Sequence, residues 1–201
     1  MNCTDHDEMA LRSRKVALRR QLSARRQETN DIERTVAAKS LRDTVLSLPE
    51  IQMAGTVAAY VSVGTEPETR GLIYALWKRG TYVLLPLLLA DYDLDWASYE
   101  GPDSLAEGPR GLLQPTEAPR GVQAVTSADL VIVPALAVDR LGRRLGRGGG
   151  SYDRALARVG AAVPTMALIY DHELLDEVPA GRHDQPVRMV ARPGHGITRL
   201  R

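Results

Sequence analysis

The fold is decided by one stretch, residues 129–158, which reads DLVIVPALAVDRLGRRLGRGGGSYDRALAR. Residues 130–133 form an apolar run of the length of a buried strand, and Pro134 closes this run. Such runs are typical of parallel sheets, because both faces of those sheets are covered. A glycine-rich basic loop comes next, and a helix is predicted over residues 151–159. The order of strand, basic glycine loop and helix start indicates a phosphate-binding site.

The residue types of the loop suit an anion. Its four glycines carry no side chain that would block a ligand, and they are Gly146, Gly148, Gly149 and Gly150. Their amides can converge on an anion at the positive end of the helix, and Arg144 and Arg147 add forked donors. Asp153, in the first helical turn, could hold Mg²⁺ against the same phosphate oxygens, because Mg²⁺ typically takes one or two carboxylates plus phosphates and waters.

The loop differs from the common phosphate motifs. A P-loop ends in Gly-Lys-Ser/Thr, and this triplet is missing from the sequence. The dinucleotide fingerprint also fails, because Ser151 stands where its third glycine belongs. The alternative interpretation is a flexible linker with solvated arginines. Linkers seldom stand directly between a buried strand and a helix start, so we favour the anion loop.

Residues 139–154 closely resemble the signature of the 5-formyltetrahydrofolate cyclo-ligase family. The heart of the match is Arg144-Leu145-Gly146-Arg147-Gly148-Gly149-Gly150-Ser151-Tyr152-Asp153. The resemblance extends over most of the chain and includes the Lys-x-x-Leu-Arg of residues 15–19 and Glu66 after the first predicted strand. At one position the chain departs from the family: an aromatic residue usually stands at 151, so a ring that would help to line a folate pocket is missing.

The resemblance implies an ATP-dependent ligase of one-carbon metabolism that converts 5-formyltetrahydrofolate, with or without a polyglutamate tail, into 5,10-methenyltetrahydrofolate. The implied ATP-binding residues are Lys15, Arg19, Arg144, Leu145, Gly146, Arg147, Gly148, Gly149, Gly150, Ser151 and Tyr152. The implied substrate-binding residues are Val61, Glu66, Arg147, Gly148, Gly149, Gly150 and Ser151. Asp153 and Asp184 are the implied Mg²⁺ ligands. Arg147 is the implied catalytic residue, because it would stabilise charge on the moving γ-phosphoryl group.

Along the chain, apolar spacing predicts helices over residues 5–28 and 31–48. Strands are predicted over residues 56–63, 81–85, 165–169 and 187–191, with a possible edge strand over 94–99. The β-loop-α-loop-β succession predicts one three-layer α/β/α domain over residues 1–201 with a mostly parallel sheet. For Trp96 two interpretations stay open, stacking on a substrate ring and ordinary packing. Most arginines of the first helix are interpreted as a solvated face; they are Arg12, Arg14, Arg20, Arg25 and Arg26.

Composition narrows the function classes. With 201 residues, 44% of them hydrophobic, the chain can bury a large core. A formal charge of +1 and an aromatic content of 4% give no support to nucleic-acid binding. The single cysteine allows no internal disulfide, and no apolar run approaches the length of a membrane span. We therefore expect a cytoplasmic enzyme, a monomer or weak homodimer, that binds neither nucleic acid nor membrane.

Two alternatives stay open at this point. The chain could be a paralogue, or another enzyme on a related α/β frame, that binds a phosphate-bearing substrate without ATP turnover. It could also be a nucleic-acid-binding module that uses its basic N-terminal helix, in which case binding would depend steeply on salt. Zinc is not expected, because the four histidines lack metal-ligand spacing.

Overall fold

The computed structural model describes the backbone of residues 3–200 and the side chains of residues 7–200. Residues 1, 2 and 201 of the expected domain lie outside the described residues. Within residues 3–200, seven strands form a central sheet in the order β12 (Gly196–Arg199), β11 (Met189–Arg192), β9 (Thr165–Leu168), β6 (Leu130–Pro134), β1 (Thr56–Ala58), β2 (Tyr82–Leu88) and β3 (Leu94–Ser98). The strands from β11 to β2 are parallel, and the two edge strands β3 and β12 are antiparallel to their neighbours.

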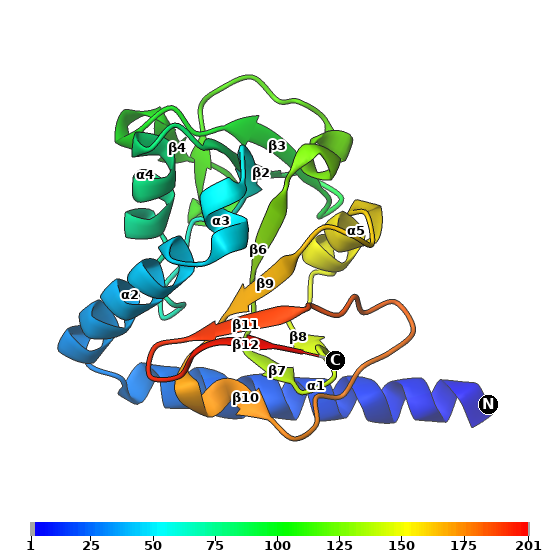
Figure 1. Cartoon of the computed structure of the whole chain (residues 1–201). Coiled ribbons are helices and arrows are strands. Elements are labelled where there is room, and N and C mark those ends of the chain that lie inside the picture. The colour runs from blue at the N-terminus through cyan, green and yellow to red at the C-terminus, as the bar shows by residue number, and fades with distance from the viewer. Residues whose placement is uncertain (1–2, 201) are drawn as a thin grey trace.

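Helices cover both faces of this sheet (Figure 1). One face carries α2 (Asp31–Leu46), α3 (Pro49–Met53) and α4 (Arg70–Lys78), and the other carries α5 (Ser151–Arg158) and the 3₁₀ helix η3 (Val122–Ser127). Side chains alternate along each strand, so Val57 packs toward α2 and α4 while the next residue, Ala58, packs toward α5. The predicted three-layer fold with a mostly parallel sheet is confirmed.

The first helix lies outside these layers. α1 (Cys3–Glu28) runs beneath a small sheet of β10 (Leu174–Leu175), β7 (Ala137–Asp139) and β8 (Arg144–Leu145), as Figure 1 shows. Leu22 of α1 packs there against Leu136, Leu145 and Val178. The helix is thus held by residues from the second half of the chain. None of the helices over residues 3–200 combines the length and the apolar composition that crossing a bilayer requires.

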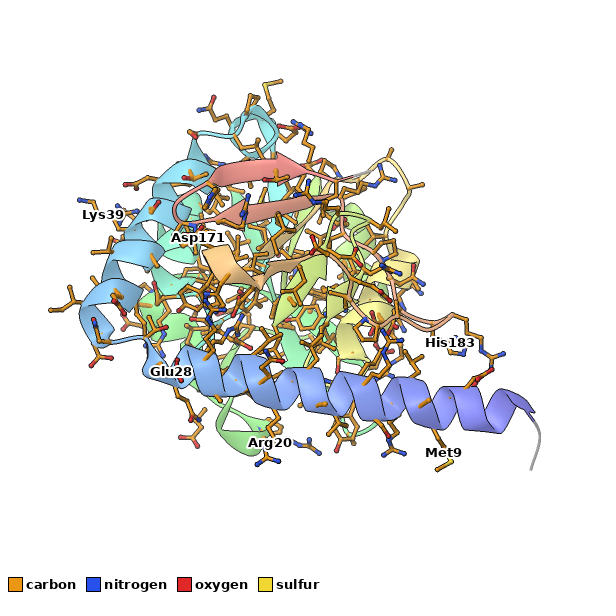
Figure 2. The ribbon with its side chains drawn as sticks, turned by 90° about the horizontal axis from the view of Figure 1, so that it is seen from below. Met9, Arg20, Glu28, Lys39, Asp171 and His183 are labelled. Carbon is orange, nitrogen blue, oxygen red and sulfur yellow. The ribbon has the colours of Figure 1, made fainter. Side chains whose placement is uncertain are left out.

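One arginine of α1 was assigned wrongly from the sequence. Arg26 is buried, not solvated: only 1% of its surface is exposed. Its guanidinium donates to both carboxylate oxygens of Glu173, over 2.6 and 2.8 Å, and to the Ala135 carbonyl over 2.6 Å. The sequence pattern could not reveal this, because the partner lies far along the chain. Figure 2 shows that Arg20, by contrast, points away from the sheet.

Several elements differ from the predicted ones. The first strand ends at Ala58, not at residue 63, although the Ala59 amide still donates to the Leu84 carbonyl over 2.9 Å. β12, β7, β8 and β10 were not predicted, because they are only two to four residues long. Trp96 is fully buried in the core, so of its two interpretations the structure supports packing. The segment after β3 holds a hairpin and short 3₁₀ helices: η1 (Pro102–Ser104), β4 (Leu105–Glu107), η2 (Pro109–Gly111) and β5 (Leu113–Pro115).

Candidate active site

A deep cleft of about 1360 Å³ opens at the carboxyl ends of the parallel strands. Tyr60 and Val61 follow β1 into its wall, and Pro134 and Ala135 come from the end of β6. β1 and β6 are neighbours in the sheet, and from β1 the chain first proceeds to β2 on one side and then returns to β6 on the other. Ligands of open α/β sheets bind at such a switch point, which makes this cleft the candidate site.

The cleft brings together every residue that was assigned to ATP, the folate or Mg²⁺. They come from α1, from the segment after β1, from the loop between β8 and α5, and from the loop before β11. The complete set is Lys15, Arg19, Val61, Glu66, Arg144, Leu145, Gly146, Arg147, Gly148, Gly149, Gly150, Ser151, Tyr152, Asp153 and Asp184. Because these segments are distant in sequence, their convergence is a result of the fold alone.

The glycine loop presents bare backbone to the cleft. Gly148 has a φ of +107° and Gly150 a φ of +69°, a region that side-chain-bearing residues rarely adopt. Among the described residues, no protein acceptor takes a hydrogen bond from the amides of residues 147–150. Arg19 fixes the loop from below, because its Nε donates to the Gly146 carbonyl over 2.8 Å. These amides line the cleft next to the N-terminus of α5, where backbone donors can bind an anion.

Lys15 joins the loop before β11 to α1. Its Nζ lies 2.5 Å from Oδ2 of Asp184, and the Gly181 amide donates to the same oxygen over 2.5 Å. Burial lowers the pKa of Arg19, one turn further along the helix, while the charge of Asp184 raises it. Figure 2 shows His183 of this loop beside the N-terminal half of α1. Lys15 and Arg19 therefore face the cleft on one side of the helix, as the sequence predicted.

Asp153 and Asp184 each have one carboxylate oxygen engaged, and the other oxygen has no partner among the residues that the structure describes. Oδ1 of Asp153 accepts from the Arg144 guanidinium over 2.8 Å and from the Gln185 amide over 3.1 Å. Oδ2 of Asp184 accepts from Lys15 and Gly181. In the described part of the chain, no three His, Cys, Asp or Glu side chains gather into a metal-binding group. Asp153 and Asp184 both line the cleft, and two carboxylates match the one or two that Mg²⁺ takes when phosphates and water complete its shell.

The Arg144 side chain is buried and hydrogen-bonded to other protein groups. Its side chain is only 3% exposed, and its guanidinium donates to Asp153 and, over 3.2 Å, to the Pro134 carbonyl. In this arrangement it orients Asp153, and contact with a phosphate would compete with these bonds. Arg147 is different, because its side chain is 58% exposed.

Glu66 and Arg147 form an ion pair across the cleft. Nε of Arg147 lies 2.9 Å from Oε1 of Glu66, and its Nη2 donates to the Val63 carbonyl over 3.1 Å. The other carboxylate oxygen of Glu66 accepts the Val63 amide over 2.8 Å. The carboxylate is nearly buried, with 7% of its side chain exposed. A ligand that approaches Glu66 must share or displace the Arg147 contact.

Sequence reasoning missed three further cleft residues, Tyr60, Tyr92 and Arg110. Tyr92 and Arg110 both have positive φ, of 67° and 64°, and the Arg110 guanidinium stacks 4.2 Å from the Tyr92 ring centre. A Cβ on Gly149 would lie 3.5 Å from this ring, so an aromatic side chain from the turn after β2 borders the glycine loop. Tyr60 lies inside the strand predicted over residues 56–63, whereas in the structure β1 ends at Ala58 and Tyr60 lines the cleft.

The comparisons with known proteins agree with one another. The sequence model of the 5-formyltetrahydrofolate cyclo-ligase family matches residues 11–193. The chain is 39% identical to the 5-formyltetrahydrofolate cyclo-ligase of Mycolicibacterium smegmatis, over 93% of this chain and 97% of the relative. It is 31% identical to the enzyme of that name from Escherichia coli K12, over 74% and 84%. The Aquifex aeolicus 5,10-methenyltetrahydrofolate synthetase structure superposes with a TM-score of 0.81, at 26% identity and over 93% of both chains.

Proposed function

Because the chain belongs to the 5-formyltetrahydrofolate cyclo-ligase family, whose reaction is an ATP-dependent cyclisation, we propose that it makes 5,10-methenyltetrahydrofolate in the cleft after β1 and β6. The chain is therefore a ligase of folate metabolism. One observation carries the assignment of the site: the glycine loop, Lys15, Glu66 and Asp184 converge on one cleft from four separate segments.

The phosphates of ATP bind at the glycine loop. The free amides of residues 147–150 donate to the phosphate oxygens, and Lys15 and Arg19 add positive charge from α1. Leu145, Ser151 and Tyr152 border the nucleotide at the two ends of the loop. Arg147, the most exposed of the loop's charged contacts, is free to leave Glu66 and follow the γ-phosphoryl group.

Asp153 and Asp184 would hold Mg²⁺, which would neutralise charge on the phosphates when bound. Arg144 keeps Asp153 in position, and Lys15 does the same for Asp184. The protein thus supplies two oriented carboxylates to the metal, and the salt links behind them fix where the carboxylates point.

The folate binds on the opposite wall, toward Val61 and Glu66. A pterin ring presents an amino group and a ring N–H side by side, and a carboxylate can accept from both. The buried Glu66 therefore orients the ring, while Val61 and the backbone of residues 148–151 line the rest of the pocket.

The chemistry requires position and charge rather than a covalent nucleophile. The formyl oxygen on N5 attacks the γ-phosphorus of ATP, and ADP leaves. The neighbouring nitrogen N10 then attacks the activated carbon, the carbon–oxygen bond breaks, and the oxygen departs with inorganic phosphate. Arg147 stabilises the negative charge that develops on the transferring group, and the cleft holds the two substrates in line.

The test is a direct assay of the purified protein with ATP, Mg²⁺ and 5-formyltetrahydrofolate. We expect the near-ultraviolet absorbance of the methenyl product to rise, with one ADP released for each product molecule. Removal of Mg²⁺ with a chelator should stop both signals, and its return should restore them. ADP release that does not depend on the formyl-folate, or no product at all, would contradict the proposal and favour a paralogue without this reaction.

We also propose that the enzyme works in the cytoplasm as a monomer or weak homodimer. The small-molecule substrate and the formal charge of +1 support a protein that binds neither nucleic acid nor membrane. Sedimentation over a range of concentrations, and binding to labelled single-stranded DNA at moderate salt, test these two statements.

A further inference from the structure

The hydroxyl group of Tyr60 is a buried donor without a partner. Tyr60 is 2% exposed, and its hydroxyl makes no hydrogen bond to any residue that the structure describes. Within the described residues, eight buried side-chain atoms lack a partner, and only the Tyr60 hydroxyl and Nε of Arg144 belong to residues that line the cleft. A buried polar group without a partner carries a free-energy cost, so such groups in a native protein call for an explanation.

The Tyr60 side chain is held firmly in this position. Its own carbonyl accepts the Thr69 hydroxyl over 2.6 Å, and its ring packs in the core between the sheet, α2 and α4. Tyr60 lines the same cleft as Glu66, the carboxylate proposed to orient the substrate. Burial first, and then Glu66, raise the pKa of Tyr60 well above its ordinary value. The hydroxyl therefore keeps its proton and acts as a donor.

A pterin ring carries a hydrogen-bond acceptor on the same edge as two hydrogen-bond donors. The 2-amino group, the N3–H and the 4-oxo group follow one another, and they present a donor, a donor and an acceptor. Glu66 can accept from the first two groups only. An additional donor beside Glu66 is needed to complete recognition of this edge.

We propose that the Tyr60 hydroxyl donates a hydrogen bond to the 4-oxo group of the folate, and that Tyr60 thereby selects 4-oxo over 4-amino pterins. The inference rests on the proposed function, because it takes the ring edge to lie against Glu66. A 4-amino group would place a donor opposite the donor of Tyr60, and the buried hydroxyl would again lack a partner. Tyr60 is thus a specificity-determining residue of the folate pocket.

The chain offers a matched control. Tyr82 also has a buried hydroxyl without a partner, but Tyr82 does not line the cleft. Tyr60→Phe and Tyr82→Phe remove the same atom from two buried sites and leave both rings in place. Since neither hydroxyl has a protein partner, neither substitution should lower stability in urea denaturation.

The experiment measures by calorimetry the Kd of 5-formyltetrahydrofolate and of its 4-amino-4-deoxy analogue. We expect Tyr60→Phe to weaken binding of the 4-oxo compound about 3- to 10-fold. Binding of the analogue should be unchanged or tighter, so the preference ratio falls in this variant. Tyr82→Phe should keep the wild-type ratio.

An unchanged ratio in Tyr60→Phe, or an equal fall in Tyr82→Phe, would overturn the inference. The result can be separated from a failure of the proposed function. If the wild type forms the methenyl product while the ratio does not respond to Tyr60→Phe, only the role of Tyr60 is wrong. If the wild type binds neither compound, Tyr60 has no such partner and the folate assignment falls as well.

Discussion

Replacement of Arg26 by methionine tests how the cleft is supported. The wild-type guanidinium makes two hydrogen bonds with Glu173 and one with the Ala135 carbonyl, at 2.6 to 2.8 Å, and both charged side chains are essentially inaccessible. Methionine fills much of the space but leaves a buried carboxylate without its counter-ion. Breaking a buried pair by removing one partner typically costs about 3–5 kcal/mol.

This cost is large beside the total stability of a domain, which is about 5–15 kcal/mol. For a chain of this size it corresponds to a fall in Tm of about 6–20 °C. Burial alone would lower the pKa of Arg26, but the hydrogen bond and charge of Glu173 outweigh it and raise the pKa above its ordinary value. The guanidinium is charged at every working pH, so the loss should be present throughout the neutral range.

Urea denaturation followed by circular dichroism measures the change. Arg25→Met is the control, because Arg25 is the exposed neighbour on the same helix, and its substitution should stay within about 0.5 kcal/mol of the wild type. The double variant Arg26→Met/Glu173→Leu should recover part of the loss, since no unpaired charge then remains. If Arg26→Met were as stable as Arg25→Met, the buried ion pair would not stabilise the fold as predicted.

Three further predictions concern the site and its pH dependence. Lys15→Ala removes a charge-assisted contact and should raise the KM for ATP about 10-fold or more, whereas Lys39→Ala, on the exposed side of α2, should not. Arg147→Ala should lower kcat about 100-fold with a smaller effect on the folate KM, and unchanged turnover would refute its role. The hydrogen bond from Arg158 holds the pKa of Asp93 below 3.8, so its stabilising contribution is present above about pH 4 and is lost as the pH falls further. Asp93→Asn should therefore flatten the dependence of unfolding free energy on pH below about pH 4, and a slope equal to that of the wild type would contradict this.

The parallel core of the fold could be predicted because its signals are local. The apolar run of residues 130–133, the helical spacing around Leu72 and the glycine loop each fall within a few consecutive residues. The small sheet beside α1 could not be predicted, because its strands are two or three residues long. β12, with the sequence GITR, is partly exposed and lacks the apolar alternation of a buried strand.

The candidate site shows the same division. The glycine loop is visible as a motif, whereas Lys15 and Glu66 gained their meaning from the family resemblance. Tyr60 and Arg26 could not be identified, because their importance depends on burial and on partners that only the folded chain brings near. The Glu66–Arg147 ion pair was equally invisible, since the two residues lie far apart in the sequence.

The position of α1 has a consequence for folding during translation. This helix leaves the ribosome before its anchors Gly146, Glu173 and Asp184 have been made. Translation adds about 5–20 residues per second. For many seconds α1 therefore has no partner for its apolar side, which carries Leu22. A nascent chain that lacks these anchors therefore cannot place Lys15 and Arg19 in the proposed nucleotide site. The site is complete only after Asp184 has been made, and a ribosome stalled before Glu173 would display an undocked helix to chaperones and proteases.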